Sequence, residues 1–142
     1  MSPEAQRVLD ALMSKSDVKI TEALKTTVSE AEAGIILEAM AVKINKDTKV
    51  DTMHIKAFVS FALSDESRYV SALEYIKTFS ASALSTSCMV YLANFAEKSG
   101  LQSEMQEISK IWGITDANLE TAFNNCINIE DTNGNIKYIS RK

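Results

Sequence analysis

The only histidine in the chain, His54, follows Asp51 at a spacing that would place a carboxylate and an imidazole on the same face of a helix. Helical bundles that bind two metal ions use Glu-x-x-His pairs of this kind, but they need two of them. This chain has one histidine, and its two cysteines, Cys88 and Cys126, lie far apart in sequence. The sequence therefore favours a helix start capped by Asp51 with a surface histidine, and it predicts no metal site.

The two cysteines are the other residues with reactive side chains. Both are flanked by apolar residues at helical spacing, and neither lies beside a glycine or at a predicted helix start that would lower its pKa. They are interpreted as buried thiols in a reducing compartment. Since no nucleophile, base and orienting group can be assembled from the sequence, we expect no catalytic residue, no cofactor and no enzyme activity.

The stretch IEDTNGNI, residues 129–136, resembles a calcium-binding loop only superficially. The first position is Ile129 and the twelfth is Ser140, so the two carboxylates that contribute most to such a loop are missing. Asn133 and Gly134 between two segments of strand-forming residues instead predict a small β-hairpin at the C-terminal end.

A second pattern immediately precedes this predicted hairpin. In MQEISKIWGITDANLETAFNNC, residues 105–126, Gly113 separates two short helical segments whose apolar residues Ile108, Trp112, Leu119 and Ala122 would pack together. This stretch resembles the helix-turn-helix of DNA-binding proteins, and with the hairpin it resembles a winged helix. The resemblance implies DNA contacts from three asparagines and three cations, which are Asn118, Asn124, Asn125, Lys137, Arg141 and Lys142.

The charge of the presumed DNA-reading helices opposes this interpretation. Between residues 103 and 127, Lys110 is outnumbered by four acidic side chains, which are Glu104, Glu107, Asp116 and Glu120. Cations are what hold a protein to phosphate, because each contact releases counterions from the nucleic acid. A structural corner in a helical bundle is therefore favoured over a DNA-reading motif.

Composition limits the fold class. The chain has 142 residues, 46% of them hydrophobic, with one proline, four glycines and a net charge of −4. We expect one domain, residues 1–142, folded as a compact all-α bundle of about seven or eight short helices with the C-terminal hairpin. A serine-rich run at residues 80–87 marks the place where a sub-boundary would fall. With no leader sequence and no long apolar segment, a cytoplasmic protein without membrane contact is expected.

Local patterns place the helices. Ser2, Ser29 and Asp51 are predicted N-caps, and Gly100 is a predicted C-cap. Apolar residues cover most of the circumference between residues 31 and 44, including Ile35 and Val42, so this helix is expected to be buried on several sides at the centre of the bundle. In the helix after Ser64 and Asp65, the predicted inward stripe is Tyr69, Val70, Leu73 and Ile76.

Two functions of different class follow from these patterns. The favoured one is a non-enzymatic, acidic helical module that binds another protein, of the adaptor, assembly-factor or inhibitor type, with a homo-oligomer as a further expectation. The alternative is a winged-helix-like transcriptional regulator that binds DNA through residues 103–142.

Overall fold

A computed structural model describes residues 1–112, 129–131 and 136–138, and within them the chain is mostly helical. The α-helices are α1 (Pro3–Leu12), α2 (Asp17–Leu24), α3 (Glu30–Lys46), α4 (Thr52–Leu63), α5 (Tyr69–Ile76), α6 (Thr86–Ser99) and α7 (Gln102–Ile111). Two single 3₁₀ turns, η1 (Glu66–Arg68) and η2 (Ala81–Ala83), precede α5 and α6. The prediction of an all-α chain of short helices is therefore confirmed for residues 1–112.

The helices begin where short polar side chains can cap them. The hydroxyl of Ser2 accepts a hydrogen bond from the Ala5 N–H, and the hydroxyl of Ser29 accepts one from the Glu32 N–H. A carboxylate oxygen of Asp51 accepts from the Met53 N–H at 2.8 Å. Each bond satisfies one of the N–H groups that a helix start leaves unpaired. These three predicted N-caps are confirmed.

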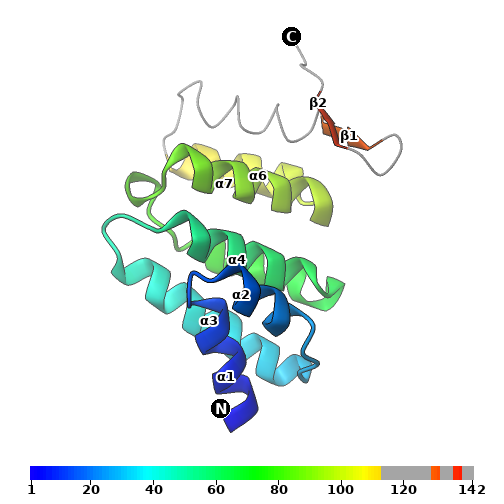
Figure 1. The fold of residues 1–142 in the computed structure, drawn as a ribbon. Helices are drawn as coiled ribbons and strands as arrows, with labels where there is room; N and C mark the ends of the chain where they lie inside the picture. The colour runs from blue at the N-terminus through cyan, green and yellow to red at the C-terminus, as the bar shows by residue number, and fades with distance from the viewer. Residues whose placement is uncertain (113–128, 132–135, 139–142) are drawn as a thin grey trace.

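The helices are stacked in successive layers (Figure 1), with α1, α2 and α3 at one end, α4 in the middle, and α6 and α7 at the other end. One continuous cluster of buried apolar residues runs from Ala5 in α1 to Ile108 in α7. Its largest fully buried side chains include Phe58 and Phe61 of α4 and Phe95 of α6. α4 therefore contributes to the core on more than one side.

α3 is less enclosed than its sequence predicts. Ile36, Leu37 and Met40 are completely buried, but Ile35 is 45% exposed and Val42 is 49% exposed. The expectation that apolar residues around this helix are covered on several sides is wrong for this outer face. Apolar side chains make it favourable to bury a face of a helix, but the face is buried only if another element packs against it. No described element packs against this face of α3.

The start of α5 also differs from its prediction. Asp65 caps the 3₁₀ turn η1, where its carboxylate accepts from the Ser67 N–H at 2.9 Å, and α5 begins only at Tyr69. The residues of α5 that face inward also differ from the predicted stripe. Val70 is 68% exposed, whereas Ala72 is completely buried. The predicted stripe is thus correct for Leu73 and Ile76, and it is wrong for Val70.

Two glycines give a paired test of backbone conformation. Gly100 ends α6 with φ of 76°, and Gly34 lies within α3, and a Cβ added to either would meet no atom within 4 Å. Gly100→Ala should therefore lower the free energy of unfolding by about 1 kcal/mol, because alanine is strained at positive φ. Gly34→Ala should raise it by roughly 0.5–1 kcal/mol, because alanine favours the helix. Urea unfolding of both variants measures the two changes in the free energy of unfolding, which should have opposite signs. Equal changes would contradict a left-handed conformation at Gly100 and a helical one at Gly34.

The structure also describes the two short strands β1 (Ile129–Asp131) and β2 (Ile136–Tyr138), which pair in antiparallel orientation with Glu130 opposite Lys137. The residues that would form the predicted Asn133–Gly134 turn lie outside the described residues, so the hairpin turn stays a prediction. Among the helices that the structure describes, none is long and apolar enough to cross a membrane.

Candidate functional site

Most of the residues predicted to contact DNA lie outside the described part of the chain. This holds for Asn118, Asn124, Asn125, Arg141 and Lys142, as it does for Cys126 and Gly113. Lys137 belongs to β2, where its register partner is the acidic residue Glu130. In the first helix of the predicted motif, Ile108 is buried and Trp112 is half-buried, as predicted. The winged-helix interpretation otherwise stays a prediction.

His54 and Asp51 make separate interactions instead of forming one site. Asp51 pairs with Lys15, with 3.1 Å between the carboxylate oxygen and Nζ. His54 is only 5% exposed, and its Nε2 lies 3.3 Å from the carbonyl oxygen of Met13, while its Nδ1 has no hydrogen-bond partner. The predicted cap is therefore correct, but the predicted surface histidine is wrong, because the end of α1 packs over the start of α4. Within the described residues, no group of three or more His, Cys, Asp or Glu side chains could hold a metal ion.

Hydrogen bonds and charge stabilise the ionised form of Asp51. The backbone N–H of Met53 makes the largest contribution to lowering the pKa of this carboxyl below its ordinary value of 3.8, and the hydrogen bond from Lys15 comes second. Both interactions favour the carboxylate, which is the form that caps α4. The pair therefore has a structural explanation, which is to fasten the α1–α2 turn to the start of α4.

Cys88 is completely buried, as predicted, but it lies in the first turn of α6. Sequence patterning placed the start of this helix earlier and so did not put the cysteine at a helix start. Its neighbours are hydroxyl groups, with Ser85 Oγ at 3.4 Å and Thr52 Oγ1 at 3.8 Å from the sulfur. The thiol packs within the interface between α4 and α6 and does not open onto a described pocket.

A groove lies between α1 and α2. The two helices are joined by a tight turn in which Lys15 has φ of 63°. Ser14 and Ser16 fix this turn, because the Ser14 hydroxyl accepts from the Ser16 N–H and the Ser16 hydroxyl accepts from the Lys19 N–H. The short turn holds the helices side by side, and the space left between their side chains is a hollow of about 360 Å³.

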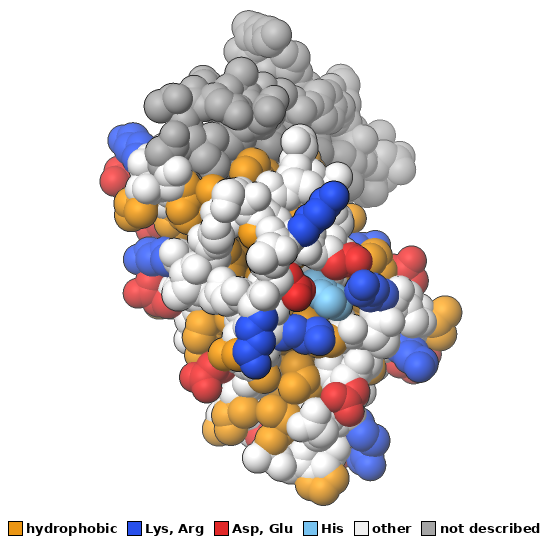
Figure 2. Space-filling model, turned by 90° about the vertical axis from the view of Figure 1, so that its left-hand side faces the viewer, with side chains coloured by type: hydrophobic (Ala, Val, Ile, Leu, Met, Phe, Trp, Pro, Cys, Tyr) orange, Lys and Arg blue, Asp and Glu red, His pale blue; other side chains and the backbone are white. Residues whose placement is uncertain are grey.

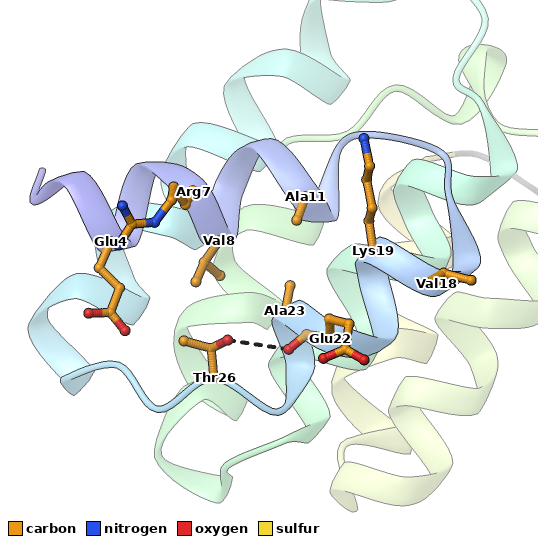
Figure 3. Close-up of a pocket in the computed structure, with 9 residues that line it drawn as sticks. All are labelled: Glu4, Arg7, Val8, Ala11, Val18, Lys19, Glu22, Ala23 and Thr26. Carbon is orange, nitrogen blue, oxygen red and sulfur yellow. Dashed lines mark hydrogen bonds between the residues drawn. The ribbon is translucent and has the colours of Figure 1, made fainter.

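The floor of this groove is apolar. Val8 and Ala11 of α1 and Ala23 of α2 point into the space between the helices (Figure 3). Val8 and Ala23 are buried, whereas Val18, at the edge of the groove, is 74% exposed. An exposed apolar side chain beside an apolar hollow is a feature of surfaces that bind other molecules.

The rim of the groove carries charges of both signs. Glu4 and Arg7 extend from α1, and Lys19 and Glu22 extend from α2 (Figure 3). None of these four side chains is buried. Each helix thus contributes one acid and one base to the groove, so the rim as a whole is neutral although the protein is acidic.

Residue patterns along the chain do not reveal this groove. Amphipathic spacing along α1 and α2 indicates which residues face inward, but it does not show the distance between the two helix axes. Val18 was the available clue, since it is an apolar residue in the first turn of α2 that does not face inward.

No protein-family model matches the chain, and no curated protein or solved structure is significantly similar to it.

Proposed function

We propose that the chain is a non-enzymatic protein-interaction module, of the adaptor, assembly-factor or inhibitor type, and that it binds an amphipathic helical segment of another protein in the groove between α1 and α2. The observation that carries this proposal is the combination, in one groove, of a buried apolar floor, the exposed Val18 at its edge and charges of both signs around its rim.

The geometry favours a helix as the bound segment. Two antiparallel helices joined by a short turn leave an elongated depression, and amphipathic helices commonly bind such depressions through apolar side chains spaced along one face. The floor of Val8, Ala11 and Ala23 would accept one apolar anchor of the partner. Val18 would pack against a second anchor, because it also lines a neighbouring hollow with Asp17 and Thr21.

The rim gives this groove its selectivity. An acidic residue of the partner would pair with Arg7 or Lys19, and a basic residue would pair with Glu4 or Glu22. Rim charges of this kind contribute more to the association rate and to partner choice than to affinity. A uniformly acidic or uniformly basic polymer would meet repulsion from one half of the rim, which favours a protein segment of mixed charge.

Val18→Asp tests the proposal. The partner is first identified by cross-linking. The protein is expressed in its own cells with a photoreactive phenylalanine at position 18, and the cross-linked segment is identified by mass spectrometry. That segment is then synthesised as a peptide. We expect Val18→Asp to weaken binding of that peptide at least tenfold, because the new carboxylate would lie beside Glu22 at the edge of the apolar floor. Fluorescence anisotropy measures the change.

The matched control is Val70→Asp, because Val70 is 68% exposed on α5 and lines neither hollow. This variant should bind the peptide like the wild type, and position 70 should not cross-link it. Equal cross-linking from both positions, or a peptide affinity that Val18→Asp leaves unchanged, would refute a binding site in the groove.

A further inference from the structure

The outer face of α3 carries an apolar stripe with no described element packed over it. Ala31, Ile35, Ala39 and Val42 recur at intervals of four, four and three residues, so they lie in one line along the helix. Ile35 and Val42 are each nearly half exposed, Ala31 is exposed, and Ala39 is half-buried. These four residues are called the α3 stripe below.

The structure defines what borders the stripe on each side. On one side lies α1, because Ala39 and Lys43 line a hollow of about 300 Å³ with Leu9 and Met13 of that helix. On the other side lies the end of α5, where the Asn45 amide donates to Thr78 Oγ1 at 2.8 Å. The stripe is thus a ridge next to a hollow that Asp10 and Lys43 make partly polar. The lower part of the face seen in Figure 2 carries hydrophobic side chains among basic and acidic ones.

From this arrangement we infer that the α3 stripe is a self-association surface, on which α3 of a second copy of the chain packs in antiparallel orientation. A spacing of four, four and three residues is that of a helix that packs lengthwise against another helix. In a symmetric pair, Ile35 of one copy faces Val42 of the other, and the small Ala39 lies near the twofold axis, where it allows close approach of the backbones.

The charges beside the α3 stripe favour a second copy of the chain in antiparallel orientation. Glu32 lies near the N-terminal end of α3 and Lys43 near its C-terminal end, on the side that faces α1. An antiparallel twofold brings Glu32 of each copy beside Lys43 of the other, whereas in a parallel pair these two residues would lie about three helical turns apart. The antiparallel helix dipoles also attract each other.

The same symmetry makes one contact unfavourable. Because Ile35 of one copy faces Val42 of the other, the twofold axis lies midway between these two residues, close to Glu38, and the Glu38 carboxylates of the two copies approach each other. Like charges at such a contact weaken association. The inferred dimer is therefore moderate in affinity, and removal of this charge strengthens it.

Sedimentation velocity over a range from micromolar to submillimolar protein tests the inference. The wild type should show a concentration-dependent equilibrium between monomer and dimer. Val42→Asp should raise the dissociation constant at least tenfold, and Glu38→Gln should lower it. Lys43→Glu should weaken the dimer, and Glu32→Lys in the same chain should restore it, which a general loss of structure would not do.

Controls separate this surface from the α1–α2 groove. Val18→Asp should dimerise like the wild type, and Val42→Asp should still bind the peptide of the groove, with an unchanged circular dichroism spectrum for both variants. A wild type that stays monomeric throughout would overturn the inference. So would a Val42→Asp variant that dimerises like the wild type, or a Lys43→Glu variant that Glu32→Lys does not rescue.

Discussion

Phe58→Ala should lower the free energy of unfolding by about 4 kcal/mol, which is a large part of the total stability of a domain of this size. Phe58 lies in α4 with no exposed surface, and its ring meets that of Phe79 edge to face, with 5.6 Å between the ring centroids. The substitution removes the buried ring, leaves a cavity and deprives Phe79 of its aromatic partner. Urea unfolding followed by circular dichroism measures the loss.

The control for this prediction is Val70→Ala, which removes an apolar side chain that the sequence pattern places inward but the structure leaves exposed. We expect a change within about 0.5 kcal/mol, as for surface positions in general. If Val70→Ala destabilised the protein as much as Phe58→Ala, the orientation of α5 described above would be incorrect.

Arg68→Ala should lower the free energy of unfolding by roughly 2–3 kcal/mol, most of it from the buried Phe61 carbonyl that loses its hydrogen-bond donor. The side chain is 10% exposed, and its guanidinium donates to both carboxylate oxygens of Glu30 and, at 2.9 Å, to the backbone carbonyl of Phe61. It also lies over the ring of Phe61, with 4.3 Å from Cζ to the ring centroid. Alanine would leave the Phe61 carbonyl without this partner in a buried position and would weaken the link between η1 and α3, where the Ser67 hydroxyl would still donate to Glu30.

Lys77→Ala is the comparison for this second prediction. Lys77 pairs with Glu74 at 2.8 Å, but both side chains are largely exposed. Solvent screens such a pair, so we expect a loss of no more than about 0.5 kcal/mol. Arg68→Lys should also be destabilising, because an ammonium cannot reproduce the planar contacts of the guanidinium. Similar losses for Lys77→Ala and Arg68→Ala would show that burial does not strengthen the Glu30–Arg68 interaction.

The sequence by itself determined the features of this protein that depend on neighbours along the chain. The caps formed by Ser2, Ser29 and Asp51 were predicted correctly, as was the left-handed end of α6 at Gly100. These features arise from a side chain or a backbone torsion within a few residues of the helix end, so local sequence contains the necessary information.

Tertiary structure decided which apolar and polar side chains are covered. Amphipathic spacing predicted an inward face for most helices, but it did not show that Ile35, Val42 and Val70 would remain exposed or that His54 would be enclosed by the end of α1. Arg68 is a further example, because its burial depends on Glu30 and Phe61, which belong to other helices.

The physical reason is that burial is a property of pairs of elements that are distant in sequence. The α1–α2 groove exists because a short turn sets the distance between two helix axes, and the α3 stripe is open because no described helix extends over it. Periodicity along one helix records which residues would benefit from a neighbour, but it does not record which neighbour is present. The sequence thus determined the helices, and the packing between them decided which surfaces are left for a partner.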